Sequence, residues 1–279
     1  MLRTSSRGYC LVMLTPVLNS IKVIEHLYRT GEEPVLVTCS DMNAYICKYM
    51  RSSATSYKLA CEFIGAKMAN LWQLETPDMA IVNIKQEHWA GRFVQHSISA
   101  PALGSKKMEY VVDITPSTIY DVKRSLNIFR QLLKIALFDF WIANEDRNAN
   151  NANLLYDVRQ EHLVSIDYGC IFNTATFEYA MSQLTSTDTI LWSDLFKHLA
   201  KDVSPSLIDI VTRDLKKDFT EYLKRSAIQT KQLAASIPKE WKVPEDLIKE
   251  KLQQLFHKTW TDGVWDNFNE CLKENLKNE

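Results

Sequence analysis

One stretch of the chain, residues 137–169, constrains the fold more than any other: LFDFWIANEDRNANNANLLYDVRQEHLVSIDYG. Leading into it, apolar residues recur at steps of three and four, which predicts a long amphipathic helix over Ile119–Asn144. The asparagine-rich segment that follows predicts a loop, because asparagine tolerates left-handed backbone and bonds its own main chain. Two short apolar runs then predict a pair of strands, and the second ends in Asp-Tyr-Gly at 167–169.

The predicted loop and strand ends carry three side chains that suit phosphoryl transfer. Asp146 and Asn151 lie on the loop, and Asp167 follows the second strand. One carboxylate that accepts a proton, plus an amide and a carboxylate that hold Mg²⁺, form a minimal site for this chemistry. The alternative is an ordinary polar loop with a helix-end ion pair, so the pattern needs support from the rest of the chain.

The N-terminal part predicts a small antiparallel sheet. Apolar, β-branched runs predict strands over Ile21–Tyr28, Pro34–Cys39 and Ala44–Met50, with polar turns between them. A helix is predicted over Tyr57–Asn70, and a further strand over Met79–Ile84. The result is a short β-meander followed by a helix.

Lys48 and Glu62 have two interpretations each. A lysine near a strand end commonly protects a sheet edge, and a helical glutamate commonly faces solvent. In protein kinases, however, a strand lysine pairs with a glutamate of the next helix and binds the α- and β-phosphates. Lys48 and Glu62 follow that order along the chain.

The remaining segments predict two lobes that form one domain. Residues 85–118 lack a clear periodicity and are predicted to be irregular, so we place the lobe boundary near residue 85, giving lobes 1–85 and 86–279. From residue 182 onward the chain predicts helices separated by prolines. The predicted helices are Thr187–Lys201, Ser206–Ala227, Lys231–Ile237, Glu245–Lys258 and one near Trp265–Asn278. The fold class is therefore α+β, with a small antiparallel N-terminal sheet and a larger, mainly helical C-terminal lobe.

Composition excludes several other classes. A net charge of −1 argues against general binding to nucleic acid or to an acidic membrane surface. The six cysteines form no Cys-x-x-Cys pair, and the histidines show no metal-ligand spacing. The chain lacks the roughly 20 consecutive apolar residues of a membrane span. Pro16 interrupts the apolar run at residues 9–18, which argues against a secretory signal. We expect a cytoplasmic protein with reduced thiols.

Taken together, these segments resemble the HipA-like protein kinases, a compact branch related to the HipA toxins. The blocks that carry the resemblance are the strands at 21–50, CEFIGAKMANLWQLETP at 61–77, LGSKKMEYVVDIT at 103–115, FDFWIANEDRNANNANLLYD at 138–157 and VSIDYGCIF at 164–172. The catalytic-loop block is the most specific of these. The C-terminal region, about 188–279, matches only in being helical.

The resemblance implies a two-lobed kinase-like fold that binds ATP and Mg²⁺ between its lobes and phosphorylates a serine or threonine hydroxyl of a protein. Asp146 would be the catalytic aspartate, with Asn151 and Asp167 as Mg²⁺ ligands. Lys48 would hold the α- and β-phosphates, with Glu62 as its partner. An antitoxin-like regulatory protein is a further partner that the resemblance implies.

The chain departs from kinases in one respect: no glycine-rich loop is present, and no glycine lies between Gly31 and Gly65. The linker at 51–56 offers hydroxyls and amides instead, so Ser52 and Ser53 are candidate phosphate-binding residues. The same hydroxyls are candidate autophosphorylation sites. The linker is equally compatible with an ordinary surface turn.

Three functions remain open from the sequence. The first, which we favour, is a serine/threonine kinase that acts on a protein. The second is a kinase-like module that binds nucleotide or a partner without turnover, and the third is a kinase of a small molecule or lipid. The intact set of Asp146, Asn151 and Asp167 favours an active enzyme.

Overall fold

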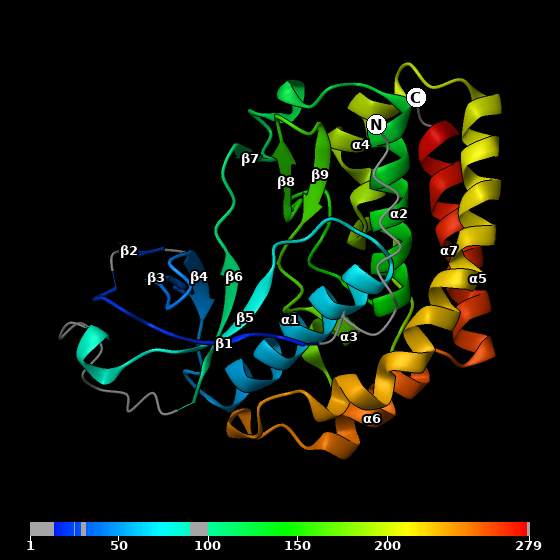
Figure 1. Ribbon diagram of the computed structural model, residues 1–279. Coiled ribbons are helices and arrows are strands. Elements are labelled where there is room, and N and C mark those ends of the chain that lie inside the picture. Colours follow the sequence, from blue (N-terminus) through cyan, green and yellow to red (C-terminus); the bar gives the residue numbers. More distant parts are fainter. Residues whose placement is uncertain (1–13, 25, 29–31, 90–99, 278–279) are drawn as a thin grey trace, which may run out of the picture.

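A computed structural model describes residues 14–24, 26–28, 32–89 and 100–277. A sheet-rich part and a larger helical part lie side by side, and helix α1 lies between the sheet and the helices (Figure 1). The predicted turn at 29–32 lies outside the described residues except for Glu32, as does the chain before residue 14. The arrangement confirms the predicted α+β class.

In the described part of the chain, the larger sheet has six strands in the order β1-β5-β6-β4-β3-β2. β1 is parallel to β5, and the other neighbours are antiparallel. The strands are β1 (Val17–Asn19), β2 (His26–Leu27), β3 (Val35–Thr38), β4 (Ala44–Lys48), β5 (Met79–Asn83) and β6 (Ala102–Lys106). The predicted β-meander is therefore present, with Lys48 as the last residue of β4.

The sheet differs from the prediction at two places. The strand expected over Ile21–Tyr28 is reduced to β2, and β1 was not predicted at all. Residues 85–118 are not irregular throughout, because β6 pairs with both β4 and β5 inside the sheet. The sheet that carries Lys48 therefore continues beyond residue 85, through a strand whose partners are distant in sequence.

Helix α1 (Ser53–Leu71) begins earlier than predicted because Ser52 caps it: the Ser52 hydroxyl accepts a hydrogen bond from the backbone N–H of Thr55, at 3.3 Å. Both faces of the helix are covered over most of its length, from Leu59 to Ala69. Such all-round burial is typical of a helix held between two layers. It places Glu62 in the interior.

Helix α2 (Leu126–Ile142) is the buried centre of the helical part. Ser125 caps its start, and Ala143 ends it in the left-handed region at φ 50°. The predicted first turns, from Ile119, instead form a one-turn 3₁₀ helix at Ile119–Asp121 followed by extended backbone at Val122. The end of α2 leads directly into the loop that carries Asp146.

A second, antiparallel sheet follows the loop, in the order β7-β8-β9. Its strands are β7 (Val111–Asp113), β8 (Leu154–Asp157) and β9 (His162–Ser165). β8 and β9 are the two strands predicted before Asp-Tyr-Gly, and their hairpin returns the chain to the loop. The short segment α3 (Ile171–Ala175) comes next, and Phe172 to Ala175 all have left-handed φ angles of 53–63°.

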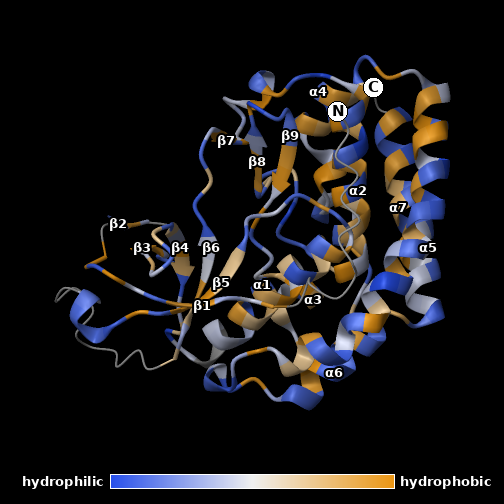
Figure 2. Cartoon of the chain, viewed as in Figure 1, coloured by the Kyte–Doolittle hydropathy of each residue, from blue (hydrophilic) through white to orange (hydrophobic). Residues whose placement is uncertain are grey.

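The C-terminal helices are α4 (Asp194–Ala200), α5 (Pro205–Ala235), α6 (Glu245–Gln254) and α7 (Lys258–Lys277). The break predicted between residues 227 and 231 is absent, because α5 runs on continuously through it. Each of these helices carries both hydrophobic and hydrophilic residues (Figure 2). The buried residues of α5 and α7 are mostly apolar. None of the helices in the described part of the chain has the length and apolar character needed to cross a bilayer.

A cluster of aromatic rings forms the centre of the core. Trp72, at the end of α1, stacks on Trp141 and on Tyr222, with ring centroids 5.0 and 4.9 Å apart. Phe138 meets the same tryptophan edge-on at 5.0 Å. Because large aromatic surfaces dominate burial energetics, this cluster fixes α1 against α2 and α5.

Candidate active site

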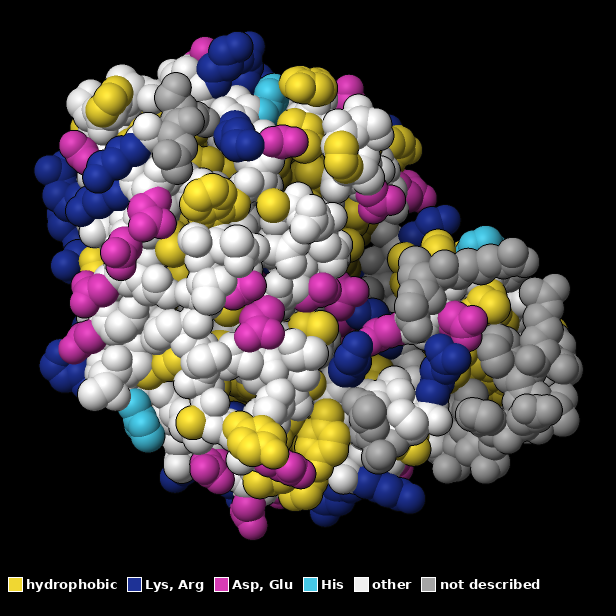
Figure 3. Space-filling model, turned by 180° about the vertical axis from the view of Figure 1, so that it is seen from behind, with side chains coloured by type: hydrophobic (Ala, Val, Ile, Leu, Met, Phe, Trp, Pro, Cys, Tyr) yellow, Lys and Arg dark blue, Asp and Glu magenta, His cyan; other side chains and the backbone are white. Residues whose placement is uncertain are grey.

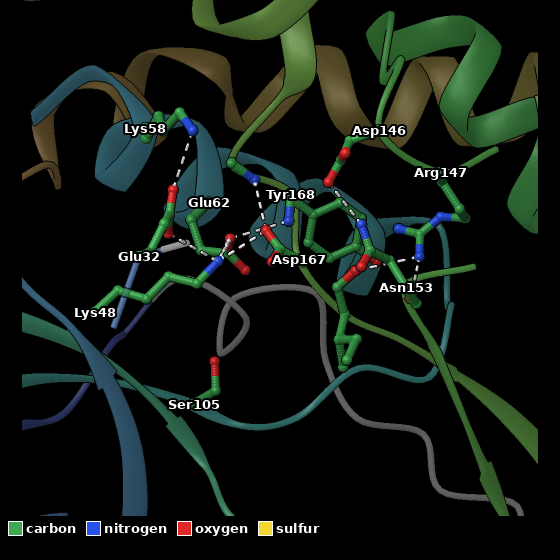
Figure 4. Close-up of polar contacts among 12 residues, drawn as sticks. Glu32, Lys48, Lys58, Glu62, Ser105, Asp146, Arg147, Asn153, Asp167 and Tyr168 are labelled. Atoms are coloured by element: carbon green, nitrogen blue, oxygen red, sulfur yellow. Dashed lines mark hydrogen bonds and ion pairs between the residues drawn. The ribbon is translucent and has the colours of Figure 1, made fainter. Parts of the chain in front are cut away.

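Three segments that are far apart in the sequence meet at Lys48. Its ammonium group lies 2.8 Å from Glu62 Oε2 on α1 and 2.8 Å from Asp167 Oδ1 after β9 (Figure 4). The sequence predicted the pair between Lys48 and Glu62, and it placed Asp167 in the same site. The structure brings all three together.

Glu62 is held on two sides. Its side chain is buried, and the same oxygen that binds Lys48 accepts a hydrogen bond from the backbone N–H of Tyr168 at 3.0 Å. Burial raises the pKa of Glu62 to about 7, although the adjacent Lys48 acts in the opposite direction. Glu62 therefore links the strand lysine to the Asp-Tyr-Gly segment.

Asp167 has a left-handed backbone at φ 57°. This conformation is uncommon for residues other than glycine, and Asp and Asn adopt it more readily than most. Burial would raise the pKa of Asp167, but the Lys48 ammonium and hydrogen bonds outweigh burial and lower it to about 2. The carboxylate is thus ionised at neutral pH.

The neighbouring carboxylates keep the Lys48 side chain protonated. Burial alone would lower its pKa, but Glu62, Asp167 and Glu32 together hold it well above the usual lysine range. A permanently charged ammonium is what a site for phosphate groups requires.

Asp146 lies on the loop between α2 and β8, as predicted. Its Oδ2 accepts a hydrogen bond from the side-chain amide of Asn153 at 2.8 Å. Asn153 itself has a left-handed φ of 45°, which turns the loop into β8. The contact orients one carboxylate oxygen of Asp146 and leaves the other free of that amide.

Asn151 lies elsewhere on the loop. It is exposed, and its backbone N–H and C=O pair with Asn148. The amide that contacts Asp146 is thus that of Asn153, two residues further on, which the sequence reasoning passed over. The Asn-x-Asn spacing before β8 was the available signal, because it places a second amide two residues after Asn151. The role of Asn151 as a metal ligand stays a prediction.

Arg147 is a residue whose function the sequence did not reveal. It is fully buried, and its Nε lies 2.9 Å from the buried Asp139 Oδ2 on α2. One of its terminal nitrogens donates to the carbonyls of Asn153 and Ile166. These two carbonyls belong to the end of the loop and to the residue before Asp167. Arg147 therefore fixes the position of the Asp146 loop relative to the segment that carries Asp167.

The two candidate phosphate-binding serines lie at the start of α1. The Ser52 hydroxyl caps the helix and lies 3.0 Å from the Thr55 hydroxyl. Ser53 is the first residue of the helix. Arg51 is paired with Glu33 at 3.0 Å. Phosphate binding by Ser52 and Ser53 stays a prediction.

A second carboxylate that the sequence reasoning missed is Glu32. Its Oε2 lies 3.4 Å from the Lys48 ammonium, and its Oε1 lies 3.3 Å from that of Lys58. No sequence pattern marks this glutamate, because it precedes β3 and acts on a strand and a helix that follow it. Among the described residues, three carboxylates thus surround Lys48, and one of them, that of Glu32, also contacts Lys58.

The donor set fits a magnesium ion bound together with phosphate. Asp167 supplies an ionised, partly exposed carboxylate, and the loop before β8 carries asparagines whose side-chain oxygens can bind a metal. Oxygen ligands of this kind, with few carboxylates, are what Mg²⁺ prefers. Seen from behind, the surface is hollowed between the larger and the smaller part, and side chains of both charges gather at its edge (Figure 3).

Comparison with known proteins shows the family to which the chain belongs. The sequence profile of the HipA-like kinases matches residues 21–268, which is most of the chain. The chain belongs to the HipA-like kinase family. The resemblance inferred from the catalytic-loop block is thereby confirmed, and so is the expectation of a kinase. No match to this HipA-like kinase was found among curated proteins.

A solved structure with a similar arrangement supports the kinase-like fold. The crystal structure of a Helicobacter pylori proinflammatory kinase, CtkA, has a TM-score of 0.50 and 10% sequence identity, covering 94% of this chain and 99% of that one. At this identity the likeness shows a kinase-like fold alone. The open conformation of CtTel1 also matches, at a TM-score of 0.32 and 11% identity over 89% of this chain and 12% of that one. A TM-score this low is too weak to support a shared fold.

Proposed function

We propose that this HipA-like kinase transfers the γ-phosphoryl group of ATP, with Mg²⁺, to a serine or threonine hydroxyl of a protein. The observation that carries the proposal is the position of the Lys48 ammonium, 2.8 Å from both Glu62 and Asp167. In active protein kinases the strand lysine pairs with the helix glutamate, and an aspartate beside this pair binds Mg²⁺, so the three residues here have the positions that phosphoryl transfer requires.

Each residue has a separate task in this proposal. Lys48 binds the α- and β-phosphates, and Glu62 holds Lys48 in place. Asp146 orients the acceptor hydroxyl and takes its proton, while Asn153 holds the Asp146 carboxylate in one rotamer. Bound Mg²⁺ would neutralise charge on the phosphates, with Asp167 and a loop asparagine as its ligands. Catalysis then consists of positioning and of electrostatic stabilisation.

A direct test is intact-mass spectrometry after incubation with Mg²⁺ and ATP. The proteins compared are wild type, Asp146→Asn and, as a matched control, Asp214→Asn, whose carboxylate lies in a partly exposed ion pair on α5. We expect an added phosphate on wild type and on Asp214→Asn, and none on Asp146→Asn. Peptide mapping then tests the hydroxyls of residues 52–56 as acceptors.

Thermal melting with Mg²⁺ and ATP separates the alternatives if wild type gains no mass. Stabilisation by ATP supports transfer to a separate protein, which radiolabelled ATP and candidate substrates would then reveal. Stabilisation without any transfer supports a nucleotide-binding module. A melting temperature that ATP leaves unchanged contradicts the proposal.

A further inference from the structure

Glu32 bridges the two lysines of the site. Its two carboxylate oxygens contact different ammonium groups, one on strand β4 and one on helix α1. Only about a quarter of its side chain is exposed, at 27%. Figure 4 shows Glu32 between Lys48 and Lys58, to the left of Glu62 and Asp167.

The place of Glu32 in the chain is informative. It lies just before β3, ahead of the strand that carries the site lysine. In protein kinases the segment that covers the phosphates comes before the lysine strand and is rich in glycine. Here this part of the chain contributes a carboxylate to the lysine instead.

The three carboxylates around Lys48 are not equivalent. Glu62 also binds the backbone N–H of Tyr168, and Asp167 accepts from the backbone N–H of Gly169 at 3.4 Å. The contacts of Glu32 in the site are with the two ammonium groups. Glu32 is therefore the carboxylate that an incoming anion can replace with the least disturbance of the backbone.

We propose that Glu32 competes with the phosphates of the nucleotide for Lys48 and Lys58, and so sets the affinity of the site for phosphorylated nucleotides. This inference rests on the proposed function, because it assumes that phosphates approach Lys48. A phosphate group and a carboxylate cannot share both ammonium groups without mutual repulsion, so binding of one weakens the hold of the other.

Glu33 provides a matched control. It carries the same charge one residue further on, but it pairs with Arg51 at 3.0 Å and both partners are well exposed. Removing its charge changes the net charge of the protein equally and leaves the contacts of Lys48 intact. A difference in nucleotide affinity between the Glu32 and Glu33 variants is therefore caused by the contacts of Glu32 with Lys48 and Lys58.

The test is isothermal titration with Mg²⁺-ADP and with adenosine, on wild type, Glu32→Gln and Glu33→Gln. We expect Glu32→Gln to bind ADP roughly three- to tenfold more tightly, the effect of one partly exposed charge contact. Its affinity for adenosine should match wild type, since adenosine carries no phosphate. Glu33→Gln should bind both ligands as wild type does. Glu32→Ala and thermal melts check that the change reflects binding and not folding.

The outcomes separate the two proposals. If wild type binds ADP and Glu32→Gln binds it equally or more weakly, the competition is overturned while the proposed function stands. An equal gain in both variants also overturns it, because net charge alone would then explain the effect. If ADP binds to none of these proteins, the proposed function fails together with the inference.

Discussion

Gly65 of α1 lies directly against Tyr168 of the Asp-Tyr-Gly segment. A Cβ atom at position 65 would lie 2.3 Å from Tyr168 Cβ and 2.6 Å from its Cγ. Tyr168 cannot yield easily, because it is fully buried and meets Phe138 edge-on at 5.9 Å. The helix that carries Glu62 and the segment that carries Asp167 therefore touch at a point where only glycine fits.

The first prediction follows from this contact. Gly65→Ala should lower the free energy of unfolding by roughly 1–3 kcal/mol, the usual cost of overpacking, despite the better helix propensity of alanine. It should also lower phosphoryl transfer by pushing Glu62 and Asp167 apart. Gly263→Ala on α7 is the control, since its Cβ would meet only the end of the Gln183 side chain at 3.1 Å. Denaturant unfolding measures the free energy of unfolding of both variants. Equal values for the two would contradict the close packing at Gly65.

The second prediction concerns the buried ion pair between Asp139 and Arg147. Asp139→Asn leaves the guanidinium buried without its counter-charge, which typically costs about 3–5 kcal/mol. The comparison is Arg130→Gln, which breaks an ion pair of similar length, 2.7 Å to Asp214, whose side chains are 44% and 36% exposed. That change should cost about 0–1 kcal/mol. Urea unfolding measures both, and a small loss for Asp139→Asn would refute a structural role for the pair.

The third prediction is a pH dependence set by Glu62. Its pKa is raised to about 7 by burial, so lowering the pH through 7 protonates the partner of Lys48. Phosphoryl transfer should therefore fall below about pH 7, measured as kcat/KM against pH. The residual activity of Glu62→Gln should not show this fall of kcat/KM below about pH 7. A profile for wild type that is flat from pH 8 to pH 6 would contradict the assignment.

The contribution of Glu62 to the stability of the fold should fall as pH rises, whereas the activity should rise. A raised folded-state pKa means that the contribution of Glu62 is fully present below its unfolded pKa, about 4.3, and is lost as pH rises through 7. The melting temperature of Glu62→Gln relative to wild type should thus increase between pH 5 and pH 7. For Asp167, whose pKa is lowered to about 2, the contribution is present above the unfolded value and is lost only as pH falls toward 2.

The fourth prediction concerns Glu145, which precedes Asp146. Its carboxylate accepts hydrogen bonds from the Asn173 amide at 2.6 Å and the Thr174 hydroxyl at 2.9 Å. These contacts offset the roughly 1–2 kcal/mol per residue that left-handed backbone costs at 172–175. Glu145→Ala should therefore increase amide hydrogen exchange across 173–176. Glu178→Ala, an exposed carboxylate nearby, should leave it unchanged, and equal exchange in the two variants would contradict the role of Glu145.

The fifth prediction separates the two loop asparagines. Because Asn153 orients Asp146, Asn153→Ala should lower turnover by roughly 10- to 100-fold at saturating Mg²⁺. Asn151→Ala should instead raise the Mg²⁺ concentration needed for half-maximal activity, if Asn151 is the metal ligand that the family resemblance implies. Magnesium titrations of both variants test this. A raised magnesium requirement in Asn153→Ala alone would transfer the ligand role to Asn153.

Local patterns were sufficient for much of the site. The lysine at a strand end, the glutamate on the next helix and the order of helix, loop and two strands around Asp146 are all features of short segments. Periodicity and turn chemistry report such segments directly, because they depend on neighbours within a few residues. These patterns placed Lys48, Glu62, Asp146 and Asp167, and the structure brings Lys48, Glu62 and Asp167 into contact.

What only the tertiary structure decided depends on partners that are distant in sequence. β6 is short and contains a glycine, and it is a strand because β4 and β5 flank it on both sides. Glu32, Arg147 and Gly65 owe their importance to Lys48, Asp139 and Tyr168, which other segments bring to them. A sequence records the charge or size of each residue, but the electrostatic and steric energy of a pair depends on a distance that folding alone sets.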